Sequence, residues 1–235
     1  MAKLSTIGFD ADDTLWHNER FFRLTQDRFA DLLRDYTDPA LLMDRLLEAE
    51  KRNIRHYGFG IKGFVLSMIE TALDVTGDTV PAPVIRSLID AGQDMLRHPI
   101  ELLPHAREAV ESVAATHRVL LITKGDLLDQ ERKLAQSGLG ELFDGVEIVS
   151  DKNAAAYAAI FARHGDGAAQ GMMIGNSMKS DVVPMVQAGG WGVYVPHGLV
   201  WEIEHAEAPA GAPRFVELPD LGGIPDLITR IEQDD

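Results

Sequence analysis

The sequence predicts an α/β fold: a doubly wound, Rossmann-like parallel sheet with an inserted all-helical cap domain. Five short apolar, β-rich runs recur at residues 4–9, 119–123, 146–149, 172–175 and 192–195, with helix-like periodicity between most of them. The runs are continuously apolar rather than alternating, which is typical of strands buried on both faces of a parallel sheet. The interval between the first two runs is too long for one crossover helix, and this predicts the insertion.

The inserted stretch shows only helical patterns from about residue 18 to residue 96, with breaks near 38–39, 58–63 and 77–83. We expect about four helices there. The predicted domains are therefore a core of residues 1–17 and 97–235 and a helical cap of residues 18–96. Within the core, the stretch 205–213 is rich in Ala and Pro and predicts a surface loop.

Composition narrows the classes of partner. Lys and Arg total 22 against 37 Asp and Glu, a net charge of -15, which argues against nucleic acid or an anionic membrane as the main partner. An anionic small substrate would then need a metal ion or a local cluster of bases. The absence of cysteine excludes disulfides, a thiolate nucleophile and Cys-built metal sites. No signal-like N-terminal segment or membrane-length apolar run is found, so we expect a cytoplasmic protein; its oligomeric state stays open.

The first predicted strand runs directly into carboxylates. Asp10 and Asp12 follow Phe9 with a spacing of two, so they start on the same side of the strand's carboxyl end, where open α/β sheets place their chemistry. Like charges held this close need a cation between them or a retained proton. The alternative is a solvated turn in which Asp10, Asp12 and Asp13 cap the next helix.

Three later strand ends carry further polar residues. Thr123, Lys124 and Gly125 end the second run, so a hydroxyl and a backbone amide emerge where a phosphate could accept from both. Lys152 stands before an Ala-rich helix, where a cation is unusual unless an anion binds there. Asp181 ends a polar turn after the fourth run and is placed to complete a magnesium site. The alternatives are a structural threonine, a solvated lysine and an ordinary first-turn acid.

Together these segments resemble the haloacid dehalogenase (HAD) superfamily over nearly the whole chain. Asp10-Ala11-Asp12-Asp13-Thr14 is similar to the family's D-x-D-x-T signature. Thr123, Lys152 and the segment 175–181 correspond, in order, to its second, third and fourth motifs. The helical insertion corresponds to a cap of the first (C1) type, as in subfamily I.

The resemblance implies a role for each matched residue. Asp10 would be the nucleophile that attacks phosphorus, and Asp12 the general acid and then base. Thr123 and Lys152 would hold the phosphoryl oxygens. Asp181 would bind Mg²⁺ together with Asp10 and the Asp12 carbonyl.

The fourth motif departs from the family pattern at Asn176, where many relatives carry aspartate. An amide oxygen can still ligate Mg²⁺ or order a ligated water, but it brings no charge. Asp10 and Asp181 would then supply more of the binding energy.

The chemistry favours a magnesium-dependent phosphatase that hydrolyses a small phosphorylated metabolite through an aspartyl-phosphate. Members that cleave carbon–halogen bonds lack an acid two residues after the nucleophile and need no magnesium, so Asp12 indicates a phosphatase. One alternative is a phosphomutase, which shares Asp10 and Asp12. The other is a ligand-binding protein that kept the fold and lost turnover.

Substrate contacts are predicted at two further places. His17, just after the first motif, is a candidate at the entrance to the site. Arg55 belongs to a basic segment, residues 51–64, that either reads an anionic substrate group or simply connects two cap helices. A separate group, His197, Glu202, Glu204 and His205, could be read as metal ligands, but it matches no helical zinc motif and is interpreted as a polar loop and helix end.

Overall fold

The computed structural model describes residues 3–199, 201–209 and 211–233. The chain forms two compact units. The α/β unit holds the chain up to Asn18, Ile100–Lys124 and the chain from Gln130 onward, and the helical unit holds Glu19–Pro99 with Gly125–Asp129.

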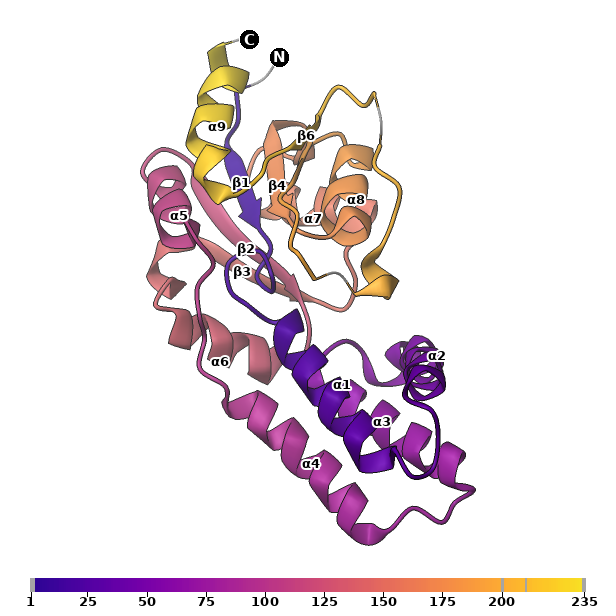
Figure 1. Ribbon diagram of the computed structural model, residues 1–235. Helices are drawn as coiled ribbons and strands as arrows, with labels where there is room; N and C mark the ends of the chain where they lie inside the picture. The colour runs from indigo at the N-terminus through magenta and orange to yellow at the C-terminus, as the bar shows by residue number, and fades with distance from the viewer. Residues whose placement is uncertain (1–2, 200, 210, 234–235) are drawn as a thin grey trace. The chain divides into compact units, whose positions relative to one another are not determined.

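The α/β unit is built on a six-stranded, fully parallel sheet in the order β3-β2-β1-β4-β5-β6 (Figure 1). The strands are β1 (Thr6–Phe9), β2 (Arg118–Lys124), β3 (Gly145–Val149), β4 (Gly171–Gly175), β5 (Trp191–Tyr194) and β6 (Phe215–Glu217). The predicted doubly wound parallel sheet is confirmed. β6 was not predicted, because three residues are too few to show a period. The strand order reverses between β1 and β4, which is where such sheets bind ligands.

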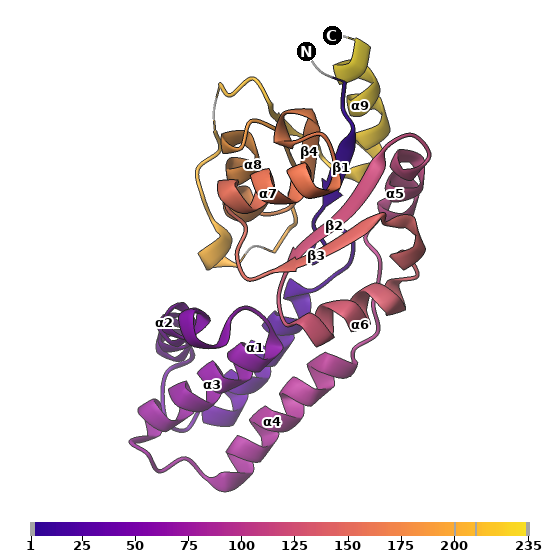
Figure 2. The same cartoon turned by 180° about the vertical axis from the view of Figure 1, so that it is seen from behind.

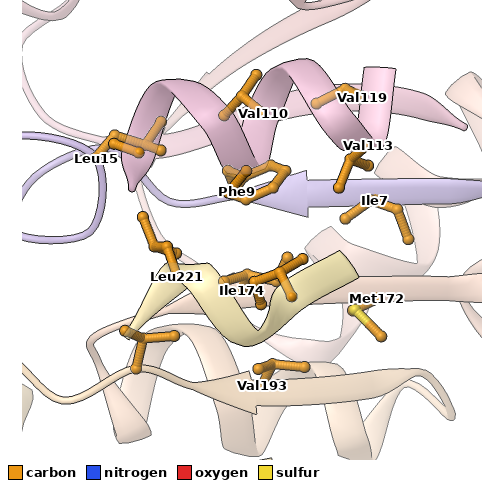
Figure 3. Close-up of a cluster of buried hydrophobic side chains, with 14 of the residues drawn as sticks. Ile7, Phe9, Leu15, Val110, Val113, Val119, Met172, Ile174, Val193 and Leu221 are labelled. Carbon is orange, nitrogen blue, oxygen red and sulfur yellow. The ribbon is translucent and has the colours of Figure 1, made fainter. Parts of the chain in front are cut away.

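The central strands β1, β2 and β4 are buried on both faces, which explains their continuously apolar runs, whereas the edge strand β3 is only partly buried. On β2, Val119 and Leu121 join one hydrophobic cluster while Leu120 and Ile122 join the other. Figure 3 shows the first cluster, in which side chains of β1, β4 and β5 pack with those of α5 (Ala106–Ala114); residues of α9 (Ile224–Gln233) belong to the same cluster. The second cluster packs against α7 (Ala154–His164) and α8 (Val183–Gln187). Since successive strand side chains alternate faces, both sets must be apolar.

The remaining local elements of this unit are α6 (Leu127–Ser137), whose first residues belong to the helical unit, and five short helical segments. These are η1 (Gly140–Leu142), η2 (Ala168–Gln170), η3 (Met178–Val182), η4 (Glu202–Glu204) and η5 (Leu221–Gly223). η3 is a π-helical turn, a geometry often found at functional sites. The described part of the stretch predicted as a loop, 205–209 and 211–213, contains no helix or strand.

The helical unit contains α1 (Glu19–Leu33), α2 (Pro39–Tyr57), α3 (Ile61–Thr76) and α4 (Ala82–Arg97) (Figure 2). Their apolar faces meet in a separate core that includes Phe29, Leu46 and Met68. The three predicted breaks are helix ends: Asp38 caps α2 through the amide of Ala40, and glycines follow α2 and α3 in left-handed backbone. In the part of the chain that the structure describes, no helix is both long and apolar enough to cross a membrane.

Candidate active site

Asp10 lies directly after β1, at the carboxyl edge of the sheet beside β4. Its amide donates to the Ile174 carbonyl at 2.8 Å, so strand pairing fixes the backbone of this residue. The residue is 7% exposed. A carboxylate held by the sheet and almost fully withdrawn from water has the fixed position that a nucleophile requires.

Lys152 joins Asp10 to Asp181. Its Nζ donates to Asp10 Oδ1 at 2.5 Å and to Asp181 Oδ1 at 2.7 Å, and all three side chains are almost fully buried. Lys152 precedes the helix cap residue Asn153, whose side chain accepts from Ala156 N. In the protein alone, the anions beside this lysine are therefore two carboxylates: that of Asp10, directly after β1, and that of Asp181, on η3.

Burial sets the electrostatics of this trio. It raises the pKa of Asp10 to about 7, with Lys152 opposing the rise and Asp181 adding to it. Burial would lower the pKa of Lys152, but the carboxylates of Asp10 and Asp181 outweigh it and raise that pKa. One ammonium between two buried carboxylates leaves the cluster short of positive charge.

Thr14 and Asn176 also lie beside Asp10 at the carboxyl edge of the sheet. Thr14 Oγ1 lies 3.1 Å from both Asp10 Oδ2 and Asn176 Oδ1, and it accepts from the Asn176 amide at 3.0 Å. A hydroxyl carries one proton, so it can donate to only one of these two oxygens at a time. Two oxygen acceptors therefore compete for a single donor.

The donor set fits a Mg²⁺ ion. Asp10 Oδ2 and Asn176 Oδ1 are hard oxygen ligands in a cluster with excess negative charge, which is what Mg²⁺ prefers. Asp181 is more committed, because its Oδ1 accepts from Lys152 and its Oδ2 from the Ser177 amide at 2.9 Å. Because both of its oxygens already accept hydrogen bonds, Asp181 would stabilise a bound Mg²⁺ ion through its negative charge more readily than as a direct ligand.

Asp12 lies close by in sequence but has its own set of partners. Its carboxylate accepts from Trp16 Nε1 at 2.8 Å, from Lys133 Nζ at 2.9 and 3.0 Å, and from Gln130 Nε2 at 3.2 Å. Lys133 also donates to Asn18 Oδ1. The sequence analysis missed these partners; their only signal is that two of them, Gln130 and Lys133, are three residues apart on the helix after β2.

Thr123 and Lys124 end β2. Thr123 is buried, and its hydroxyl accepts from Gln130 Nε2 at 2.6 Å, so one glutamine links Asp12 to Thr123. The Thr123 hydroxyl lies 3.3 Å from the Lys124 carbonyl, a long contact that leaves its proton available to a closer acceptor.

The ammonium of Lys124 is engaged elsewhere in the unit. It donates to Glu204 Oε1 at 2.6 Å and to Ser180 Oγ at 2.7 Å. Glu204 also accepts from Ser177 Oγ at 2.6 Å and from Ser180 Oγ. Burial opposes ionisation of Glu204, but the Lys124 charge and these hydrogen bonds lower its pKa.

Glu204 was thus missed by the sequence analysis, which interpreted its segment as a polar loop. Its hydrogen bonds connect η4 to the turn after β4, which carries the fourth motif.

Two other predicted residues, Arg55 and Gly125, belong to the helical unit and stay predictions as substrate contacts. His17 belongs to the α/β unit, with its ring edge-on to His197 at a centroid distance of 5.8 Å.

Comparison with known proteins defines the class. The haloacid dehalogenase-like hydrolase family matches residues 4–189. The chain is 39% identical to a haloacid dehalogenase-like family hydrolase from Xanthomonas campestris, with a TM-score of 0.88 over 98% of this chain and 93% of that one. The chain therefore belongs to the haloacid dehalogenase-like hydrolases. No curated protein gives a significant match.

More distant structures share the fold alone. The HAD-hydrolase YfnB from Bacillus subtilis, bound to magnesium, has 15% identity and a TM-score of 0.67, covering 97% of this chain and 100% of that one. The L-2-haloacid dehalogenase from Xanthobacter autotrophicus with chloropropionic acid covalently bound has 19% identity and a TM-score of 0.60, covering 96% and 98%. One of these structures holds magnesium and the other a covalently bound chloropropionic acid, so likeness of fold does not select a reaction, which must be argued from the site.

Proposed function

We propose that this hydrolase is a magnesium-dependent phosphatase that acts on a small phosphomonoester through an aspartyl-phosphate on Asp10. The observation that carries the proposal is a second carboxylate, Asp12, two residues after a buried Asp10 that is bonded to Lys152. Phosphoryl transfer to a carboxylate needs such a second carboxyl to protonate the leaving oxygen and later deprotonate water.

In the first half-reaction Asp10 attacks phosphorus, the Asp10 oxygen–phosphorus bond forms, and the bond to the leaving oxygen breaks. Asp12 gives its proton to that oxygen. In the second half-reaction water attacks the same phosphorus, Asp12 takes the water proton, and the bond to Asp10 breaks to release inorganic phosphate. For this role Asp12 must leave some of its donors, Trp16, Gln130 and Lys133, or share them with the substrate.

The other residues of the site position the phosphoryl group and neutralise its charge. Lys152 would balance charge on the phosphoryl oxygens while it holds Asp10, and the Thr123 hydroxyl would donate to one of them. Asp10, Asn176 and the Asp12 carbonyl would hold Mg²⁺ with Asp181 beside them. When bound, Mg²⁺ supplies the remaining positive charge that in-line transfer requires.

We further propose that the helical unit is the cap that selects the substrate, with Arg55 as a contact for an anionic group. Arg55→Ala is then expected to raise KM for the physiological substrate with little change in kcat, because the lost contact binds the substrate and the transition state equally well. An unchanged KM would remove Arg55 from the substrate site.

The direct test is inorganic phosphate release from an aryl phosphate, with and without Mg²⁺. Wild type should be active only with Mg²⁺, and Asp10→Asn should be inactive. Asp151→Asn is the matched control, because Asp151 is an exposed carboxylate directly before Lys152. Chloride release from 2-chloropropionate, retained without Mg²⁺, would contradict the proposal and identify a dehalogenase.

Two alternatives have their own signatures in the same assays. A phosphomutase would move the phosphoryl group between positions of a sugar without releasing phosphate. A ligand-binding protein without turnover would be stabilised by a phosphorylated ligand and form no product.

A further inference from the structure

Three side chains with metal-ligating atoms meet at a second place in the α/β unit. Asp13 and His17 lie on the loop after β1, and His197 lies on the loop after β5. Each offers one ligand atom, and these atoms all lie within 4.8 Å of one another. This cluster uses none of the side chains that the proposed phosphatase mechanism needs, so the inference does not rest on that mechanism.

The His197 ring is oriented as a metal-binding imidazole would be. Its Nδ1 lies 3.1 Å from the Leu199 carbonyl and 3.4 Å from the Leu199 amide, and the shorter contact requires a proton on Nδ1. In a neutral ring the lone pair is then on Nε2, which faces Asp13 Oδ1 at 3.6 Å. A lone pair facing a carboxylate oxygen needs a positive charge between the two atoms, which either a proton on Nε2 or a bound metal ion can supply. Histidine ligands typically donate their other ring nitrogen to a carbonyl in this way.

The distances suit one small ion. With metal–ligand bonds of about 2.0 Å, two ligand atoms of a tetrahedral site lie about 3.3 Å apart. The corresponding separation of two imidazole centroids is about 5 Å. The structure has 3.6 Å between His197 Nε2 and Asp13 Oδ1 and 5.8 Å between the rings of His17 and His197. These two pairs need a contraction of less than about 1 Å to reach ligand spacing, and the 4.8 Å within which all three ligand atoms lie needs at most about 1.5 Å.

The loop that carries Asp13 and His17 is already fixed by its own hydrogen bonds. The Asp13 amide donates to the Trp16 carbonyl at 2.7 Å, Asp13 Oδ1 accepts from the Asn18 amide at 2.8 Å, and the His17 amide donates to Glu101 O at 3.0 Å. Asp13 has φ 59°, a left-handed conformation that Asp and Asn tolerate better than most residues. The side chains of Asp13 and His197 are 7% and 13% exposed. Binding an ion would therefore require little further ordering of this loop and these side chains.

The ligand types select the class of ion. Two imidazoles and one carboxylate suit Zn²⁺, Co²⁺ and related first-row ions, whereas Mg²⁺ prefers oxygen ligands alone. We propose that Asp13, His17 and His197 bind a divalent first-row transition-metal ion such as Zn²⁺. The ion joins the loop after β1 to the loop after β5, and His17 thereby acquires a role other than the substrate contact expected from the sequence.

The test is a Co²⁺ titration of the metal-free full-length protein in the presence of excess Mg²⁺, followed by visible absorption. Mg²⁺ competes for an all-oxygen site and leaves an imidazole site open. We expect one Co²⁺ bound per chain, with displacement by one equivalent of Zn²⁺. Absence of stoichiometric binding would overturn the proposal and leave an ion pair between protonated His197 and Asp13.

Variants locate the ion. His17→Ala, His197→Ala and Asp13→Asn should each weaken Co²⁺ binding by more than about tenfold, since even outer-shell changes cost about 10–100-fold. Asp13→Asn keeps both the left-handed backbone preference and an oxygen for the Asn18 amide, so it preserves the fold. His205→Ala is the matched control, because His205 is an exposed histidine at the end of η4, in the same segment as His197.

A second control separates this site from the proposed magnesium site. Asp181→Asn should bind Co²⁺ as wild type does, even if it loses phosphatase activity. Equal Co²⁺ affinity in wild type, His17→Ala and His197→Ala would show that the ion binds elsewhere and would refute the assignment. Far-UV circular dichroism of each variant shows that it is folded.

Discussion

Asp10→Asn should stabilise the metal-free protein at the expense of catalysis. Asp10 is buried beside Asp181, and burial raises its pKa from 3.8 to about 7. A carboxyl whose pKa is higher in the folded state binds protons more tightly there than in the unfolded chain. Its ionisation therefore destabilises the fold progressively as pH rises from about 4 to about 7. Asparagine has nearly the same shape and cannot ionise, so the variant escapes this loss.

The size of the effect follows from the pKa difference. A shift from 3.8 to about 7 corresponds to about 4 kcal/mol once the pH exceeds 7, at 1.36 kcal/mol for each pH unit. At pH 5 less than half of this effect has developed, and below pH 3.8 almost none. The stability advantage of Asp10→Asn should therefore grow by about 3 kcal/mol between pH 5 and pH 8.

Urea unfolding in the presence of a chelator measures this advantage at several pH values. Asp151→Asn serves as the control, because an exposed carboxylate lacks the burial that drives the effect. A difference between wild type and Asp10→Asn that stays constant from pH 5 to pH 8 would refute the reasoning. So would equal growth of the difference in Asp151→Asn.

The remaining predictions concern the neighbours of Asp10. Lys152→Met should lower kcat/KM for an aryl phosphate by about 10²–10³-fold, since a preorganised cation facing the phosphoryl group is lost; a change below about tenfold would exclude that role. Asp181→Asn should raise the Mg²⁺ concentration for half-maximal activity by about tenfold, and by more than Asn176→Ala does, because only Asp181 carries charge; equal Mg²⁺ titrations of Asp181→Asn and wild type would contradict this. Glu204→Gln should lower the free energy of unfolding at pH 7 by about 2 kcal/mol, because Lys124 keeps its charge and loses its anion; unchanged urea midpoints would show that the pair contributes nothing.

The sequence by itself determined the sheet and the residues at its carboxyl edge. Short, continuous apolar runs rich in β-branched residues favour strands of a parallel sheet, and in such a sheet the residues after the strands share one edge. This is why Asp10, Lys152, Asn176 and Asp181 could be placed together before any coordinates, although they span most of the chain. The long helical interval likewise determined that four helices follow β1.

Only the tertiary structure decided which side chains surround that edge. Gln130 and Lys133 reach Asp12 across 118 and 121 residues of sequence, and Glu204 reaches Lys124 across 80. His197 meets Asp13 in the same manner, through the loop after β5. Such pairings depend on where a loop or helix returns after its strand, and no local period records that. The sequence thus determines where a parallel sheet places its chemistry, while the packing of the connections determines which charges are paired there.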